Sequence, residues 1–184
     1  MGIIIPANHA HIDVLADIHV QGWKEAYRGT LNPTVIDALS VDEKKDQWQK
    51  WIDDSDSQSF LYQADEASYA GFITVGKMRT APPGTSKIRP IYTGEIYAIY
   101  LRKEYWRQGI GKKLMQHGVE HLIKDGHKSA CLWVVERNKN ACQFYAHLGG
   151  QKLGKIQADI GPDGHTQSVK EACYGWRNNL ETLF

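Results

Sequence analysis

The chain has 184 residues, of which 42% are hydrophobic and 23% charged, and its formal net charge is +1. This length is enough for one α/β domain with a full core, and the composition is ordinary for a soluble globular protein. The near-zero net charge gives no argument for nucleic acid or a membrane surface as partner, and no apolar run approaches the length of a membrane span.

The cysteine and histidine patterns predict a cytoplasmic protein without a metal site. The N-terminus lacks a signal-peptide pattern. The cysteines at 131, 142 and 173 are odd in number, widely spaced and set among apolar residues, which indicates free thiols rather than disulfides, metal ligands or a nucleophile. The histidines show no metal-binding spacing.

The first half of the chain alternates strand and helix signals. An apolar run at Gly2–Ile5 predicts a strand, and apolar residues at helical spacing over His9–Tyr27 predict a long helix. The pattern then predicts a short helical turn at Thr34–Leu39, a helix that Ser40 caps and that ends near Asp53, and strands at Ser59–Ala64 and Ser68–Val75.

Residues Arg79–Pro90 form the longest irregular segment. They contain three prolines and show no hydrophobic period. A loop of this length in a compact domain is often a functional lid, so we expect Arg79–Pro90 to be mobile.

The second half predicts three strand regions and two helices. The expected elements are a strand at Glu95–Leu101, a helix from Gly109 to about Lys124, a strand at Ala130–Val135, a helix at Asn138–Leu148, and a closing strand pair at Gln151–Gln157 and Gln167–Trp176. This order predicts an α/β (α+β) fold with a mixed, mostly antiparallel sheet of about seven strands and about four helices. We expect a single domain over residues 1–178, followed by a tail at 179–184.

The stretch from Glu95 to Leu114 carries the strongest chemical signal. A buried strand leads into Gly109-Ile110-Gly111 at the start of an amphipathic helix. Glycines let a ligand approach the backbone, and the first N–H groups of a helix lack partners and carry partial positive charge. This geometry favours a phosphate or pyrophosphate ligand.

Two common nucleotide motifs do not fit this stretch. A P-loop would need glycine where Trp106 stands and a hydroxyl where Lys113 stands, and a dinucleotide fingerprint would need a third glycine at Leu114. The remaining pattern, [Q/R]-x-x-G-x-[G/A], fits Gly109 and Gly111 but has Trp106 in its first position.

The pattern [Q/R]-x-x-G-x-[G/A] is that of the acyl-coenzyme A loop of the GNAT acetyltransferases. In this pattern and its surroundings the chain resembles that family. Gly109 follows Glu95 by fourteen residues, as in members with a glutamate base. The segment from Asn138 through Ala141, Phe144, Tyr145 and Gly149 is similar to the family's N-x-x-A-x-x-F-Y-x-x-x-G-F ending, with Gly150 in place of the aromatic. Trp23, Ala26, Tyr27 and Gly29, followed by Asp37 to Ser40, resemble a bacterial subgroup. The resemblance covers most of the chain.

The resemblance implies a coenzyme site between two parallel strands that splay apart, Glu95–Leu101 and Ala130–Val135. Backbone groups at Ile99 and Leu101 would bind the pantetheine, and residues 106–112 would surround the pyrophosphate. The implied coenzyme contacts are Ile99, Tyr100, Leu101, Trp106, Arg107, Gln108, Gly109, Ile110, Gly111, Lys112, Asn138 and Tyr145.

The same resemblance implies two catalytic residues and an acceptor pocket. Glu95 is the candidate general base, acting through water, and Tyr145 the candidate general acid toward the leaving thiolate. Each has a structural alternative: a solvated glutamate at a strand start, and an aromatic residue in the core. Trp23, Tyr27 and Trp133 are candidates for the acceptor pocket or for ordinary core packing, and Arg79–Pro90 is expected to border it. Asn138 can also cap its helix.

The leading hypothesis is therefore an acetyl-CoA-dependent N-acetyltransferase, an acyltransferase acting on a primary amine of a small molecule or peptide. The alternatives are a non-catalytic acyl-CoA-binding or regulatory module and a protein N-terminal or side-chain acetyltransferase. Expected partners are the amine acceptor and coenzyme A, with no metal, nucleic acid or membrane, and the protein is expected to be a monomer or homodimer.

Overall fold

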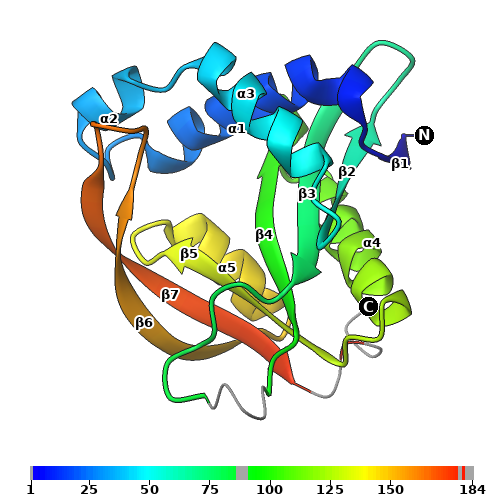
Figure 1. Ribbon diagram of the computed structural model, residues 1–184, viewed down its shortest axis with the longest axis vertical. Coiled ribbons are helices and arrows are strands. Elements are labelled where there is room, and N and C mark those ends of the chain that lie inside the picture. The colour runs from blue at the N-terminus through cyan, green and yellow to red at the C-terminus, as the bar shows by residue number, and fades with distance from the viewer. Residues whose placement is uncertain (1, 86–90, 178–179, 181–184) are drawn as a thin grey trace.

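The computed structural model describes residues 2–85, 91–177 and 180. Within these residues, seven strands form one sheet in the order β1-β2-β3-β4-β5-β7-β6, in which only the β4–β5 pair is parallel (Figure 1). The strands are β1 Ile3–Pro6, β2 Ser57–Gln63, β3 Tyr69–Lys77, β4 Gly94–Leu101, β5 Ser129–Val135, β6 Gln151–Ile160 and β7 Gln167–Arg177.

The helices begin where side chains can bind the free N–H groups of a first turn. The α-helices are α1 Ile12–Tyr27, α2 Pro33–Asp37, α3 Val41–Ile52, α4 Ile110–Lys124 and α5 Lys139–His147, with short 3₁₀ turns η1 at His9–His11 and η2 at Lys103–Tyr105. Asn8, Asn32, Ser40 and Asn138 accept hydrogen bonds at the starts of η1, α2, α3 and α5. In the described residues, the starts of α1 and α4 have no such side-chain cap, and α1 continues directly from η1.

The helices cover both faces of the sheet. Helices α4 and α5 pack on one face, where Leu114, Met115 and Tyr145 join Ile73 and Ile96 in the largest core cluster. Helices α1 and α3 pack on the other face, with Leu15, Ile18 and Trp48 against Leu61 and Phe72. The β6–β7 hairpin reaches across to α2 on that same face (Figure 1). The sheet therefore has two buried faces, one for each helix layer.

Strands β4 and β5 separate after a short paired region. They pair only from Gly94 to Ile96 and from Ala130 to Leu132, and both continue beyond these residues. The register between β3 and β4 also shifts beside Tyr97, which has no partner on β3. A bulge of this kind bends a strand, and it lies where β4 begins to diverge from β5.

The predicted fold class is confirmed, with five α-helices rather than about four because Pro33–Asp37 forms a helix of its own. The predicted splay of the two parallel strands is also present. Leu180, in the predicted tail, is 3% exposed and belongs to the main core. Residues 86–90 of the predicted Arg79–Pro90 loop lie outside the described residues.

Candidate active site

The start of α4 has the backbone conformation that the glycines allow. Gly109 is the N-cap with φ of 78°, and Arg107 has φ of 61°, so the chain turns twice through left-handed conformations before the helix begins. No side chain caps the helix, which leaves its first N–H groups directed outward with the positive end of the helix dipole. The arrangement suits an anionic group.

Gly111 lies on the first turn of α4, directly against neighbouring elements. A Cβ atom at this position would come within 3.4 Å of Phe144 on α5 and 3.7 Å of Leu101 on β4. The first turn of α4 therefore packs closely against both the end of β4 and α5.

Two side chains just before α4 donate hydrogen bonds to backbone carbonyls of the turn that leads into the helix. The indole N–H of Trp106 donates to the carbonyl oxygen of Leu101 at 3.0 Å, and the amide of Gln108 donates to the carbonyl oxygen of Glu104 at 2.8 Å. The Trp106 side chain is 38% exposed. Trp106 and Gln108 thus shape the turn, and the Leu101 carbonyl, expected to be free, already accepts one hydrogen bond.

The end of β4 presents its side chains to both faces of the sheet. Ile99 and Leu101 pack against the core under α4 and α5, whereas Tyr100 lies toward α1. The Tyr100 ring stacks on His19 with centroids 5.0 Å apart. The side chains therefore hold the diverging strand in place, while the backbone of residues 97–101 has no ladder partner on β5.

Glu95 is buried in the first part of β4, where this strand still pairs with β5. It is 6% exposed, and its Oε2 accepts hydrogen bonds from the backbone N–H groups of Arg79 at 2.7 Å and Thr80 at 2.9 Å. Burial raises the pKa of Glu95 above its ordinary value, while the two N–H groups and the Arg79 charge oppose that rise. The alternative of a solvated glutamate is therefore wrong, because the carboxyl group is enclosed by the chain that follows β3.

Tyr145 lies on α5 in the core, 7% exposed. Burial, with Tyr27 and Cys142 nearby, raises the pKa of its phenol, so the hydroxyl stays protonated at neutral pH. Asn138 caps α5, its Oδ1 accepting from the Ala141 N–H at 3.2 Å. The structure thus contains a buried phenol that can donate a proton, and it bears out the capping role of Asn138.

The three acceptor-pocket candidates lie on the face opposite α4. Trp23 and Tyr27 contact each other edge to face on α1, with centroids 5.0 Å apart. Trp133 lies on β5 and its indole N–H donates to the Thr80 carbonyl oxygen at 3.1 Å. All three belong to apolar clusters, Trp23 and Tyr27 to one and Trp133 to another, so they also contribute to the packing.

The described part of the Arg79–Pro90 loop follows this same face. Its first residues form hydrogen bonds with Glu95 and Trp133. Pro83 lies against Gly154 on β6, where a Cβ atom would come within 3.1 Å of the proline ring. Arg79 stacks over Tyr97, with its guanidinium carbon 3.9 Å from the ring centroid, and forms an ion pair with Asp54. The first half of this loop is thus held in place beside Glu95, and its mobility stays a prediction.

Three residues of this region were not anticipated from the sequence. The N–H groups of Arg79 and Thr80 reach Glu95 across a segment with no periodic pattern, which gave no local signal. Glu171 lies on the inner face of β7, opposite Val135. A glutamate between Val169 and Cys173, at an alternating apolar position, was the available signal.

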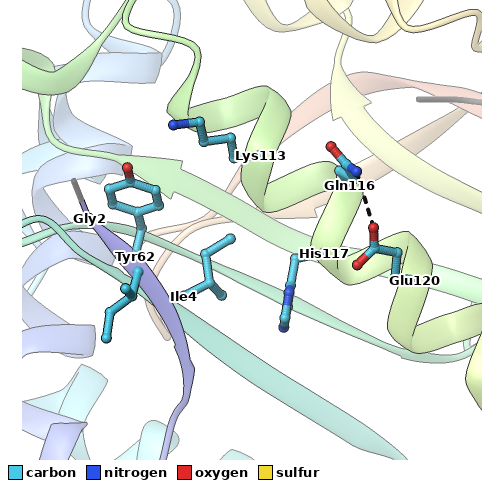
Figure 2. Close-up of a pocket in the computed structure, with 8 residues that line it drawn as sticks. Gly2, Ile4, Tyr62, Lys113, Gln116, His117 and Glu120 are labelled. Atoms are coloured by element: carbon cyan, nitrogen blue, oxygen red, sulfur yellow. Dashed lines mark hydrogen bonds between the residues drawn. The ribbon is translucent and has the colours of Figure 1, made fainter.

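Other surface features lie apart from these residues. An open groove of about 470 Å³ between β1 and α4 is lined by Tyr62, Lys113, His117 and their neighbours, none of them a predicted site residue (Figure 2). Over the described ranges, no group of three or more histidine, cysteine, aspartate or glutamate side chains is placed to hold a metal ion. Nor does any helix there have the length and apolar character needed to cross a bilayer.

Comparison with known proteins gives the family of the chain that contains the splayed strands and the glycine-containing helix start. The profile described as "Acetyltransferase (GNAT) family" matches residues 21–149, so the chain belongs to this family. An uncharacterized N-acetyltransferase of Bacillus subtilis, YuaI, is 30% identical over 88% of this chain and 85% of its own length. An uncharacterized N-acetyltransferase of Archaeoglobus fulgidus is 26% identical over 71% of this chain and 82% of its own length.

Solved structures share the fold at low sequence identity. The PaiA N-acetyltransferase of Thermoplasma acidophilum, in complex with coenzyme A, superposes with a TM-score of 0.67 at 21% identity, covering 93% of this chain and 98% of that one. YncA, a putative acetyltransferase of Salmonella typhimurium with acetyl-CoA, gives 0.65 at 11% identity, covering 96% and 94%. These likenesses establish the GNAT architecture for the whole described chain.

Proposed function

We propose that this protein is an acetyl-CoA-dependent N-acetyltransferase that acetylates a primary amine of a small molecule or peptide. One observation carries the proposal: β4 and β5 separate after Ile96 and Leu132, next to an uncapped helix start at Gly109. The opening and the anion-binding helix start together suit a ligand with an extended arm and a pyrophosphate. The family membership and the names of the relatives support the same activity.

The residues that would hold the coenzyme fall into two groups. Residues 106–112 would surround the pyrophosphate, with the glycines giving access to the backbone. Ile99, Tyr100 and Leu101 would follow the pantetheine arm, and Asn138 and Tyr145 would lie at its α5 side. The coenzyme, when bound, supplies the acetyl thioester.

Two buried groups, Glu95 on β4 and Tyr145 on α5, are the candidates for the proton transfers. We propose that Glu95 takes the proton of the acceptor ammonium through water, since its Oε1 accepts no hydrogen bond from the described residues. Tyr145 would donate its phenolic proton to the departing thiolate. Trp23, Tyr27 and Trp133 would line the acceptor side.

Location and alternatives follow from the same features. All three cysteines are free thiols, which supports the cytoplasm as the proposed location. A non-catalytic acyl-CoA-binding module would share the opening and the helix start, but it would have no need of a buried carboxylate and a protonated phenol. We therefore favour catalysis over binding alone.

Calorimetry with acetyl-CoA tests the proposed coenzyme site. Gly111→Asp places a side chain and a negative charge where a Cβ already approaches Phe144 and Leu101, so acetyl-CoA binding should be lost. Ser55→Asp, at an exposed turn, adds the same charge elsewhere and should bind like the parent. Unchanged affinity in a folded Gly111→Asp protein would refute the site.

Turnover is tested separately with a panel of primary amines and acetyl-CoA, following thiol release. The proposal expects at least one amine to be acetylated. A parent protein that binds acetyl-CoA and acetylates no amine would favour the non-catalytic module.

A further inference from the structure

Glu171 is a carboxylate in the interior of the sheet. Strand β7 lies between β5 and β6, and Glu171 pairs with Val135 on one side and Ile156 on the other. Its neighbours on the same face of β7, Val169 and Cys173, are 8% and 0% exposed. Burying a carboxylate at such a position costs solvation free energy unless a cation or hydrogen-bond donor pairs with it.

The carboxylate lies between two apolar clusters on the face opposite α4. On one side, Val135 and Val169 pack with Tyr27, and Trp23 packs against them. On the other side, Trp133 and Cys173 pack below the start of the Arg79–Pro90 loop. Glu171 therefore separates the two clusters that contain all three candidate acceptor-pocket residues.

The group has no partner of its own. The half-buried Glu171 side chain makes no hydrogen bond and no ion pair with the described residues, whereas Glu95 accepts two backbone N–H groups. Burial raises the pKa of Glu171, and its charge contributes to the raised pKa of Tyr27. A partly desolvated carboxylate without a partner can form a charge-assisted hydrogen bond with a cation that reaches it.

Solvent can reach the Glu171 side chain, which is half-buried and has no oxygen among the fully buried atoms that lack a partner in the described residues. A groove of about 400 Å³ begins beside it, lined by Val135, Val169 and Lys170 among others, although Glu171, Tyr27 and Trp133 do not line this groove. Lys170 and Glu171 are consecutive in a strand, so their side chains point to opposite faces. Val135 is also the last residue of β5, at the open end of the splay.

We propose that Glu171 binds a positively charged group of the acceptor, which makes the acceptor a cationic amine. This inference rests on the proposed acetyltransferase function and narrows its substrate class. The ammonium would lie between Tyr27 and Trp133, whose rings favour a cation, and would pair with Glu171. Amines whose net charge is zero or negative would be poor acceptors, because a second carboxylate would repel Glu171.

The test measures amine binding to protein saturated with coenzyme A, so that no turnover occurs. The calorimetric probes are 1,4-diaminobutane, butylamine and 4-aminobutanoate, which share a four-carbon chain and differ in charge. The parent should bind the diamine most tightly and 4-aminobutanoate most weakly. In Glu171→Gln the affinity for the diamine should fall about tenfold, the loss expected when a charge-assisted contact becomes neutral.

Two further variants separate binding from a structural role. Glu171→Asp keeps the charge and should keep more of the diamine preference than Glu171→Gln. Asp159→Asn removes an exposed carboxylate from the adjacent strand β6 and should bind all three probes like the parent. In steady-state assays Glu171→Gln should raise the KM for the amine and leave kcat within about threefold, since the lost contact is made before chemistry.

The outcomes distinguish this inference from the proposed function. Equal diamine affinity in the parent and Glu171→Gln, or no detectable binding of either cationic probe to the coenzyme-loaded parent, would overturn the role of Glu171. Acetyl-CoA binding and turnover with a different kind of amine would then leave the acetyltransferase proposal intact. A parent that does not bind acetyl-CoA would instead refute the proposed function.

Discussion

Individual side chains in this protein are tuned mainly by burial. Glu95, Tyr145 and Glu171 all have pKa values raised because water is excluded from the groups, and each keeps its proton to a higher pH than the free side chain does. For a base this shift brings the pKa closer to neutral pH, where proton transfer is most effective. For a phenol it preserves the donor form.

Replacing Glu95 by glutamine tests the proposed base. Turnover should fall by about two to four orders of magnitude, the usual range for general base catalysis, while acetyl-CoA affinity stays the same. Since the pKa of Glu95 is raised, the activity of the parent should decline on acidification at a pH above the ordinary pKa of glutamate. That acidic limb should flatten or move in Glu95→Gln, as pH–rate profiles would show. Parent-like turnover in the variant would place the base elsewhere.

His19 gives the folded state a sensitivity to acid. Its ring is 6% exposed among aromatic side chains, and burial, with the nearby Lys44, lowers its pKa from 6.5 to about 3. The unfolded chain therefore binds a proton near pH 6.5 that the folded chain refuses until about pH 3. Stability contributed by the neutral ring is lost as the pH falls through this window.

We expect His19→Phe to remove this part of the acid sensitivity. The difference in unfolding free energy between the variant and the parent should change by up to about 1.4 kcal/mol per pH unit between roughly pH 6 and pH 4, in favour of the variant. Urea denaturation across this range measures it. His147→Phe, at an exposed position on α5, is the control and should follow the parent. Parallel curves for His19→Phe and the parent would contradict the assignment.

At the scale of elements, glycines allow close contacts between α1 and β4 and between α2 and the β6–β7 hairpin. Helix α1 approaches β4 at Gly22, where a Cβ would lie 2.5 Å from Cδ1 and 2.9 Å from Cβ of Tyr100. The β6–β7 hairpin approaches α2 at Gly161, which has φ of 136° and leaves no room for a side chain beside Val35. These glycines let α1 lie directly on β4 and let the β6–β7 hairpin lie directly against α2.

Gly22→Ala should weaken the packing of α1 on β4. Alanine gains about 1 kcal/mol of helix propensity, but a contact near 2.5 Å forces helix or strand to move, at a cost of about 1–3 kcal/mol. We expect a net loss of unfolding free energy in urea denaturation. Gln21→Ala, the exposed preceding residue, should be neutral or slightly stabilising. A Gly22→Ala protein as stable as Gln21→Ala would show that the two elements can separate without cost.

At the scale of the whole molecule, the shortest ladder among the described strands is the one between β4 and β5, beside the opening. Among the described strands, β1–β4 and β5–β7 share only the Gly94–Ile96 and Ala130–Leu132 ladder. Further contact comes from helices on either side and from the loop after β3, through Thr80 and Pro83. A ligand between the strands would therefore contact both halves at once. Binding only to the folded state stabilises it by mass action.

Acetyl-CoA should raise the unfolding temperature, and above Kd the rise should grow with the logarithm of the acetyl-CoA concentration. At about one hundred times Kd the stabilisation should be about 2.7 kcal/mol. Thermal unfolding at increasing acetyl-CoA measures it, with Gly111→Asp as the variant that should show no shift and Ser55→Asp as the one that should shift like the parent. An equal rise in Gly111→Asp would mean that the stabilising ligand binds elsewhere.

The sequence alone determined the features that depend on local pattern. Alternation and helical spacing located every strand and the long helices, while Pro33–Asp37 was expected only as a helical turn. The spacing of Glu95, Gly109, Asn138 and Tyr145 indicated the family, because the coenzyme loop and its flanking elements are contiguous in the chain. Interactions between residues close in sequence decide these features, so the amino-acid sequence is enough to predict them.

Only the tertiary structure decided the surroundings of the reactive groups. The binding of Glu95 by the Arg79 and Thr80 N–H groups depends on how an irregular loop folds back over the sheet. The position of Glu171 between Tyr27 and Trp133 depends on the register of β7 against β5 and on the placement of α1 over both. A shift of one residue in that register would turn Glu171 to the opposite face. Register and helix placement are set by packing between segments far apart in the chain, which no local pattern encodes.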